Sequence, residues 1–288
     1  MRTDDFRPSD NVEDNREARG GIPGGAGGLG IGTIVIVGLI SWYFGIDPSV
    51  LLNGAQILTG GTSSQQSGTA PPVTTGTPND ATGKFVALVL GDTEDTWKEI
   101  FAASGRTYHP PKLRLFSGAE QGGCGLARSA MGPFYCPNDQ RIYLDTAFFN
   151  DLQNKFGGCD NNSACKFSEA YVIAHEVGHH VQNLIGATRL PTRGETPNQT
   201  SVRVELQADC FAGVWGHTAR SALQITDEDL AEALTAAHAI GDDTLGHSDE
   251  RTFTHGSSEQ RMRWFRRGFD SGDARQCDTF AVQNHREL

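Results

Sequence analysis

The sequence has little positive charge relative to its acidic content. Its 24 Lys and Arg residues stand against 35 Asp and Glu residues, which gives a formal net charge of −11 at pH 7. A nucleic-acid surface needs clustered Lys and Arg, so this balance argues against that class of partner. We therefore expect no nucleic acid among the partners, and the acidity by itself identifies no other partner.

Cysteine pairs of the form C-x-x-C are also absent, which argues against a zinc cluster held by cysteines. The six cysteines form an even set. Six cysteines allow fifteen connectivities, so pairing between near neighbours is only a preference. Six free thiols in a cytosolic protein are the alternative. The preferred disulfides are Cys124–Cys136, Cys159–Cys165 and Cys210–Cys277.

Residues 20–46 contain no charged side chain. Their apolar centre, LGIGTIVIVGLISWYFGI, is long enough to span the hydrocarbon core as a helix. Trp42 and Tyr43 lie near its far end, where amphipathic rings prefer the membrane interface. These features predict a transmembrane helix over residues 27–46. A cleaved signal peptide and a buried glycine-rich core helix are the alternatives.

Lys and Arg flank this span on one side only. Four arginines precede it, and no Lys or Arg follows it until Lys84. The positive-inside rule therefore predicts that segment 1–26 is cytoplasmic and that the rest of the chain lies outside the cytoplasm. The expected protein is a single-pass membrane protein with an extracytoplasmic main domain.

The main domain is expected over residues 84–288, about 200 residues, which is within the single-domain range. Residues 47–83 precede it and are rich in Gly, Ser, Thr, Gln and Pro, so they are expected to form a flexible linker. Within the domain, the pattern predicts strands over 112–118, 133–135 and 141–145, and helices over 85–104, 146–156, 168–186, 199–220, 227–240 and 256–270. This order indicates an α+β domain, mainly helical with a small sheet.

The stretch YVIAHEVGHHVQN, residues 171–183, contains the pattern H-E-x-x-H. On a helix, His175 and His179 lie four residues apart on one face, so both imidazoles can reach one metal ion. Glu176 is rotated by about 100° from His175, too far to ligate with them but placed to contact a metal-bound water. Ser168 is a candidate N-cap and Gly186 a candidate stop for this helix. The pattern alone is a weak signal, and an ordinary surface helix is the alternative.

A catalytic zinc site needs three protein ligands and one open position. Glu205 and Asp209, four residues apart in VRVELQADCFAGVWG, share one face of a second predicted helix. Glu205 is the predicted third ligand, and Asp209 is predicted to accept the second N–H of a ligating histidine. A solvated acidic face is the alternative. His180 is not expected to ligate, because it duplicates the position of neither His175 nor His179.

HEVGHH followed by ELQAD resembles the zincin metallopeptidases whose third ligand is a glutamate. More closely, the chain resembles the bacterial neutral zinc metallopeptidase family through SDNVEDNR, GPFYCPNDQRIYLD, AYVIAHEVGHHVQN, RVELQADCFAGVW and HGSSEQRMRWFRRGF. The resemblance covers nearly all of the chain except the linker and the CDNNSAC loop. It implies a zincin-like endopeptidase domain with one Zn²⁺ per chain, anchored in the bacterial cell membrane.

The implied mechanism assigns each part a role. Zinc lowers the pKa of its bound water and polarises the scissile carbonyl, while Glu176 takes the water proton and passes it to the leaving amine. Similar zincins carry a late histidine that stabilises the oxyanion, so His255 is the candidate, with a surface histidine as the alternative. Arg261 is the candidate to orient Asp209. By analogy, strand 141–145 is expected at the edge of the cleft, where a peptide can add by backbone pairing.

The sequence therefore predicts a zinc-dependent endopeptidase that hydrolyses peptides or proteins at the extracytoplasmic face of the membrane. Two alternatives stay open. One is a non-catalytic envelope module that uses the metal for stability and binds a protein partner. The other is a peptidase that acts on peptidoglycan stem peptides. Two imidazoles and a carboxylate suit zinc, although they do not exclude other divalent ions.

Overall fold

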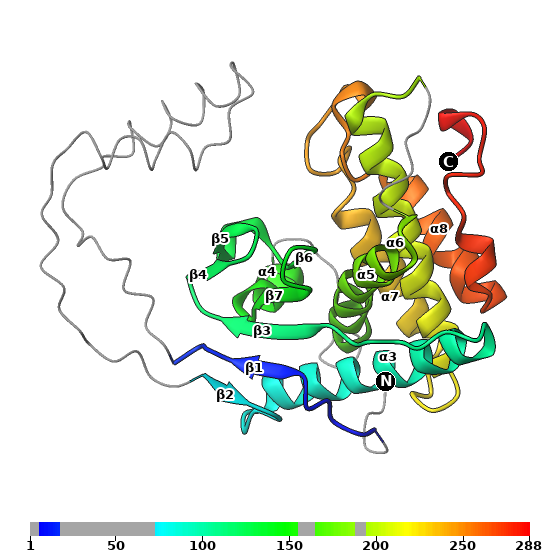
Figure 1. Cartoon of the computed structure of the whole chain (residues 1–288). Coiled ribbons are helices and arrows are strands. Elements are labelled where there is room, and N and C mark those ends of the chain that lie inside the picture. Colours follow the sequence, from blue (N-terminus) through cyan, green and yellow to red (C-terminus); the bar gives the residue numbers. More distant parts are fainter. Residues whose placement is uncertain (1–5, 18–72, 155–164, 188–193) are drawn as a thin grey trace, which may run out of the picture. The chain divides into compact units, whose positions relative to one another are not determined.

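The computed structural model describes residues 6–17, 73–154, 165–187 and 194–288 (Figure 1). The predicted transmembrane helix, most of the predicted linker and the predicted Cys159–Cys165 pair involve residues outside these ranges. Within the described ranges, every helix is too short or too polar to cross a bilayer.

A mixed sheet of five strands forms one part of the domain, in the order β2-β1-β3-β7-β6. The three central strands are parallel, and β2 and β6 pair antiparallel at the two edges. A separate hairpin joins β4 to β5. The strands are β1 Val12–Asp14, β2 Thr74–Thr75, β3 Lys112–Phe116, β4 Ala119–Gly122, β5 Gly125–Arg128, β6 Phe134–Cys136 and β7 Arg141–Asp145.

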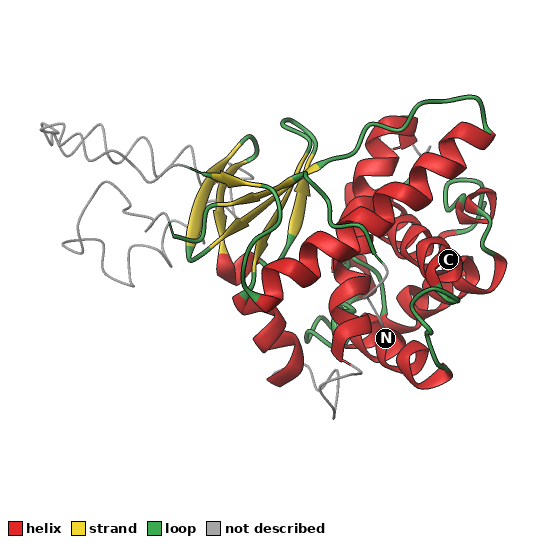
Figure 2. Cartoon of the chain, turned by 90° about the horizontal axis from the view of Figure 1, so that it is seen from below, coloured by secondary structure: helices red, strands yellow, loops and turns green. Residues whose placement is uncertain are grey.

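Helices make up the rest of this unit, and Figure 2 shows most of them packed together on one side of the strands. They are α3 Ala81–Ala103, α4 Ala147–Asn154, α5 Cys165–Ile185, α6 Pro197–Ala219, α7 Asp227–Ala239 and α8 Ser258–Ser271. Capping boxes explain where three of them begin: Thr196 with Gln199, Thr226 with Asp229, and Ser257 with Gln260. The predicted α+β class with a small sheet is confirmed.

The helix that carries the H-E-x-x-H pattern starts earlier than predicted. Helix α5 begins at Cys165, three residues before the predicted start, so Ser168 lies inside the helix and is not its N-cap. Its hydroxyl instead donates to the carbonyl oxygen of Glu232 at 3.2 Å. The predicted stop is present, since Gly186 follows the last helical residue with a φ of 74°, a conformation that favours glycine.

Strand β1 belongs to the domain, although the sequence assigned residues 1–26 to a separate segment. Val12 is fully buried, and β1 lies between β2 and β3. The Glu13 carboxylate accepts from Arg114 at 2.7 Å and from Arg141 at 3.1 Å. The compact unit therefore includes residues up to 17 and resumes at Val73, rather than starting at the predicted residue 84. A three-residue strand with one apolar side chain has too weak a pattern to be recognised in a sequence.

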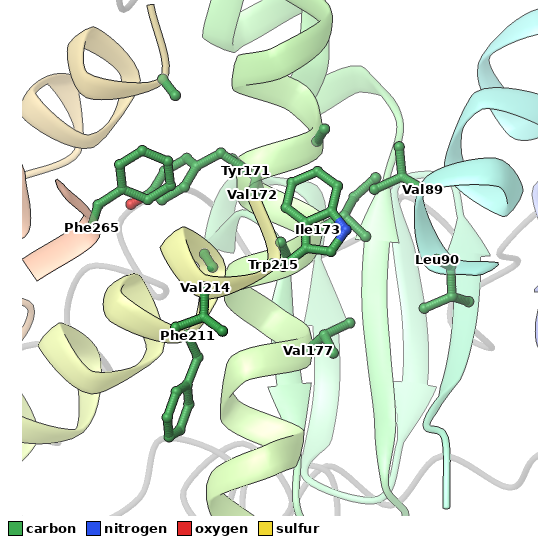
Figure 3. Close-up of a cluster of buried hydrophobic side chains, with 14 of the residues drawn as sticks. Val89, Leu90, Tyr171, Val172, Ile173, Val177, Phe211, Val214, Trp215 and Phe265 are labelled. Carbon is green, nitrogen blue, oxygen red and sulfur yellow. The ribbon is translucent and has the colours of Figure 1, made fainter. Parts of the chain in front are cut away.

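In the hydrophobic core, the motif helix α5 packs against three other helices, α3, α6 and α8 (Figure 3). Tyr171 of α5 packs edge-on against Phe265 of α8, with ring centroids 5.1 Å apart. Trp215 of α6 is fully buried, and Val89 and Leu90 of α3 lie in the same cluster. The core therefore fixes α5 relative to both α6 and α8.

Glycines allow the closest helix contacts. A Cβ at Gly178 of α5 would lie 2.9 Å from the carbonyl oxygen of Ala208 on α6. A Cβ at Gly268 of α8 would overlap the carbonyl oxygen of Cys210, and one at Gly213 of α6 would overlap that of Phe265. Helix α6 thus packs closely, backbone against backbone, on α5 at one side and on α8 at another.

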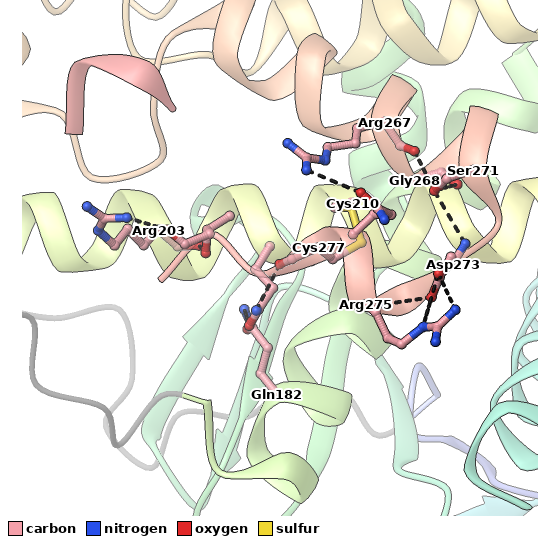
Figure 4. Close-up of a disulfide and its surroundings, with 12 residues drawn as sticks. Gln182, Arg203, Cys210, Arg267, Gly268, Ser271, Asp273, Arg275 and Cys277 are labelled. Atoms are coloured by element: carbon pink, nitrogen blue, oxygen red, sulfur yellow. Dashed lines mark hydrogen bonds and ion pairs between the residues drawn. A yellow bond between two sulfur atoms is a disulfide. The ribbon is translucent and has the colours of Figure 1, made fainter. Parts of the chain in front are cut away.

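Two of the three predicted disulfides are present. Cys210 of α6 is bonded to Cys277, which lies 67 residues later and is also buried (Figure 4). Cys124 is bonded to Cys136 at the end of β6. A native disulfide typically stabilises a fold by about 2–4 kcal/mol. The Cys210–Cys277 bond therefore joins α6 to the C-terminal segment, and the Cys124–Cys136 bond joins the β4–β5 hairpin to β6.

Substitution Gly268→Ala tests the close approach of α6 and α8. The added methyl group would force the two helices apart, so we expect a loss of stability of about 1–3 kcal/mol or more. Thermal and urea unfolding measure this loss. Asp270→Ala is the control, because Asp270 is exposed on the same helix and its removal should change stability by less than about 0.5 kcal/mol. Equal stability of the two variants would contradict the packing.

Candidate metal centre

Three side chains from two helices converge at one point. His175 and His179 project from α5 and Glu205 from α6, and a donor atom from each lies within 4.8 Å of the others. Glu205 Oε2 is 3.2 Å from His175 Nε2, and Glu205 Oε1 is 3.5 Å from His179 Nε2. Donors about 2.1 Å from a tetrahedral zinc lie roughly 3.4 Å from one another. The trio therefore has the spacing of three zinc ligands.

The charge of the trio also suits a cation. Burial raises the pKa of Glu205, but His179 and His175 outweigh burial and hold this pKa well below its usual range. The carboxylate is therefore ionised. Burial lowers the pKa of both histidines, but Asp209 and Glu205 outweigh it and raise the pKa of His175 to about 10, and Glu205 raises that of His179. The site therefore favours positive charge beside Glu205, and a metal cation bound to the two Nε2 atoms would supply it in place of protons. Two imidazoles and one carboxylate form a donor set that suits zinc.

Asp209 connects the centre to the third helix. His175 Nδ1–H donates to Asp209 Oδ1 at 2.7 Å, which leaves Nε2 of His175 free to face the metal position. Arg261 of α8 donates to both carboxylate oxygens at 2.9 Å, and the Tyr171 hydroxyl donates to Oδ1 at 2.6 Å. Burial raises the pKa of Asp209, but Arg261 and His175 outweigh it, and the pKa falls to about 2. The structure thus brings together His175, Asp209 and Arg261, the three residues for which the sequence predicted these contacts.

His179 has an orienting partner that sequence reasoning missed. Its Nδ1–H donates to Gln182 Oε1 at 2.9 Å. The Gln182 amide in turn donates to the carbonyl oxygen of Val204 at 2.6 Å and to Gln207 Oε1 at 3.1 Å. Gln182 lies three residues after His179, so the helical spacing was the available signal. Each histidine therefore has a polar partner that fixes its tautomer.

Glu176 lies beside the trio without joining it. Its side chain is buried, and its Oε2 has no hydrogen-bond partner in the part of the chain that the structure describes. Burial raises its pKa, while His179 and His175 oppose the rise. A buried carboxylate oxygen without a partner needs a ligand or a water molecule. This orphaned atom is a further observation that fits a metal site with an open position.

His255 lines one cavity together with His175, His179 and Glu205, and Asp242 orients it. His255 Nδ1 is 3.2 Å from Asp242 Oδ1, and three consecutive backbone N–H groups, from Thr254 to Gly256, donate to Asp242 Oδ2. The hydrogen bond to Asp242 raises the pKa of His255. Sequence reasoning missed Asp242, because the pair is formed by residues 13 positions apart and no short pattern connects them.

His180 does not join the metal trio. Its ring is fully buried and bonds to the Tyr135 hydroxyl at 3.0 Å and to the carbonyl oxygen of His109 at 2.6 Å. Burial lowers its pKa to about 4, so it is neutral. The structure therefore places His180 beside β6 and away from the ligands, as the sequence predicted.

An open cavity of about 810 Å³ borders the metal trio, Glu176 and His255. Strand β6 lines it, together with the segment that precedes β6. The prediction that strand 141–145 forms the cleft edge is wrong, because β7 lies between β3 and β6 and has partners on both sides. The strand at the edge that borders the cavity is β6. This strand has only three residues, so the sequence pattern could not show that it lies at an edge.

Comparisons with known proteins agree with the ligand set found in the structure. Residues 1–280 match the model of the family described as "Putative neutral zinc metallopeptidase". The "Uncharacterized protein YpfJ" of Escherichia coli is 45% identical over 302 residues, which covers 97% of this chain and 99% of the relative. No solved structure matches the chain significantly.

A second similar protein comes from another organism. The "Uncharacterized protein Rv2575" of Mycobacterium tuberculosis is 43% identical over 218 residues, which covers 70% of this chain and 69% of the relative. The family match spans both β1 and the segments that carry the trio. The chain belongs to the neutral zinc metallopeptidase family.

Proposed function

We propose that the protein is a zinc-dependent endopeptidase that hydrolyses peptide bonds. The observation that carries the proposal is the orphaned carboxylate oxygen of Glu176, which lies beside a convergent trio of His175, His179 and Glu205 in an open cavity. A purely structural metal site would be closed, and it would not need an ionisable side chain without a partner beside it.

His175, His179 and Glu205 would hold the zinc ion. A zinc ion bound there would polarise the scissile carbonyl as a Lewis acid and would lower the pKa of a water molecule. Glu176 is placed to accept a proton from the attacking water and to return it to the leaving amine. Its raised pKa suits both roles, because a more basic carboxylate accepts the proton more readily. Asp209 and Gln182 keep the two imidazoles in the tautomers that present Nε2 to the metal.

His255 is the proposed donor to the oxyanion that forms at the scissile carbonyl. Asp242 occupies Nδ1 of His255, so Nε2 remains for the substrate. The side chain is about half exposed on the cavity wall, where a bound peptide can reach it. Removing one such donor in other hydrolases lowers kcat by about 10²–10³.

Substrate is proposed to bind along β6. This strand pairs with β7 on one side only, so its other edge can hydrogen-bond to an extended peptide. Pro133, Phe134, Phe148, Val172 and Leu245 give the cavity apolar walls. An open groove with an edge strand suits internal segments of a peptide chain, which supports an endopeptidase.

We also propose that the domain works outside the cytoplasm, held at the membrane through residues 27–46. Two disulfides support this location, because such bonds form and persist in oxidising compartments and are rare in the cytosol. The apolar segment lies outside the described residues, so its support is the sequence alone.

Substitution Glu176→Gln separates catalysis from metal binding. We expect it to retain one zinc per chain and to lower casein hydrolysis by about 10²–10⁴, because the proton acceptor is lost. Elemental analysis and a protease assay measure the two effects. Glu205→Ala should lose the zinc as well as the activity.

Glu169→Gln is the matched control, since Glu169 is a buried glutamate of the same helix that pairs with Lys166 outside the cavity. It should keep its activity. A folded wild-type protein without zinc would refute the proposal. A folded, zinc-loaded wild type without hydrolytic activity would favour the non-catalytic binding module. Full activity in Glu176→Gln would refute the role of Glu176 as proton acceptor.

Substitution Asp242→Asn tests the orientation of His255. The Asp242 carboxylate raises the pKa of His255, so the wild-type imidazole stays protonated to a higher pH than an unperturbed histidine. Neutral asparagine should lower that pKa, and His255 should then lose its proton at lower pH. NMR titration of the histidine ring protons measures the shift. Asp243→Asn is the control, because Asp243 bonds to Ser258 instead; an equal shift in both variants would contradict the pairing.

A further inference from the structure

We propose that Tyr135, His180 and Asn183 position the substrate, by holding strand β6 at a fixed place relative to the metal trio. This inference rests on the proposed endopeptidase function and assigns a role to the third histidine of the motif. The three side chains form one hydrogen-bonded cluster between β6 and the C-terminal half of α5. We call it the β6 clamp.

The hydrogen bonds of the β6 clamp have only one consistent arrangement. A carbonyl oxygen can only accept, so His180 Nε2 carries the proton that is donated to His109 at 2.6 Å. Neutral His180 Nδ1 must then accept, and the Tyr135 hydroxyl donates to it at 3.0 Å. The Asn183 amide completes the cluster by donating to the Tyr135 oxygen at 3.0 Å. The hydroxyl proton of Tyr135 is therefore committed to His180 and is not offered to the substrate.

Packing reinforces the cluster. The His180 ring makes edge-on contacts with Tyr135 and Tyr108, with centroids 5.4 Å and 5.9 Å away. Because the ring is fully buried, loss of its partner would leave an unsatisfied nitrogen away from water. Breaking the hydrogen bonds of the clamp is therefore costly.

The position of the clamp links substrate binding to the metal centre. His180 and Asn183 lie three residues apart and face β6, while His175 and His179 of the same helix face α6. Tyr135 is the central residue of β6, and it pairs with Ile142 of β7. One rigid helix thus carries the ligands on one face and the anchor of the edge strand on another.

This arrangement sets the distance between a peptide paired to β6 and Glu176. A displacement of about 1 Å in a bound substrate can cost a factor of about 10² in rate. Loosening β6 should therefore harm peptides that pair along the strand. A short substrate that contacts only the metal centre and its immediate surroundings should be affected much less.

Tyr135→Phe is the test, because it removes the hydroxyl group and keeps the ring. We expect unchanged zinc content and a fall in kcat/KM of about 10-fold or more for an unstructured peptide of about ten residues. A blocked dipeptide amide, too short to pair along β6, should change by less than about 2-fold. Amide hydrogen exchange should increase in β6 of the variant, since the strand is no longer tied to α5.

A double variant and a matched control test whether Tyr135 and Asn183 act through the same cluster. Tyr135→Phe combined with Asn183→Ala should be no worse than Tyr135→Phe alone, because both remove the same cluster. Tyr143→Phe is the control: its hydroxyl bonds to Asp139 at 2.6 Å and lies outside the clamp. This control should leave the ratio of kcat/KM for the two substrates unchanged.

The outcomes separate this inference from the proposed function. An active wild type with an equal loss for both substrates in Tyr135→Phe, or with no loss for either, would overturn the positioning role alone. A zinc-loaded wild type that hydrolyses neither peptide would overturn the endopeptidase function and the positioning role with it. Selective loss on the longer peptide, together with faster exchange in β6, supports the clamp.

Discussion

The buried carboxylate of Asp209 is the group on which the arrangement of the metal centre depends. It accepts hydrogen bonds from His175 and Tyr171 of α5 and from Arg261 of α8, while α6 carries it. Removing one partner of a buried ion pair costs about 3–5 kcal/mol, because the other charge is left without compensation. The packing of three helices and the tautomer of one ligand are therefore determined together. Glycine at position 268 makes this possible, since α6 and α8 could not otherwise approach so closely.

Local periodicity explains how much of the site could be predicted from the sequence. His175 and His179, and likewise Glu205 and Asp209, are four residues apart on helices, so their shared faces follow from the helical repeat alone. Asp242 could not be found in this way. It binds His255 through a turn whose shape depends on α8 and the loop before it, and no short pattern encodes that distance.

The sheet was less predictable than the helices. The sequence predicted three strands, and these overlap β3, β6 and β7, but the pattern does not say which strand lies at an edge. Neighbours in a sheet are chosen by contacts between segments far apart in the chain. Strand β1 shows this most clearly, because its partners on β3 are about a hundred residues away. The helical half of the fold thus follows from local signals, whereas the sheet requires tertiary contacts.

Strand β1 also determines on which side of a membrane the N-terminal residues can lie. Backbone hydrogen bonds cannot cross a bilayer, so residues 6–17 must share one compartment with the domain that begins at Val73. The predicted placement of segment 1–26 in the cytoplasm, with the main domain outside it, therefore does not fit residues 6–17, which belong to the sheet of that domain. Two of the four arginines behind that prediction lie in this part of the chain. Arg7 pairs with Glu94 of α3, and Arg16 pairs with Asp80, the N-cap of α3. Their charges therefore have partners within the domain, which the count of Lys and Arg residues did not take into account.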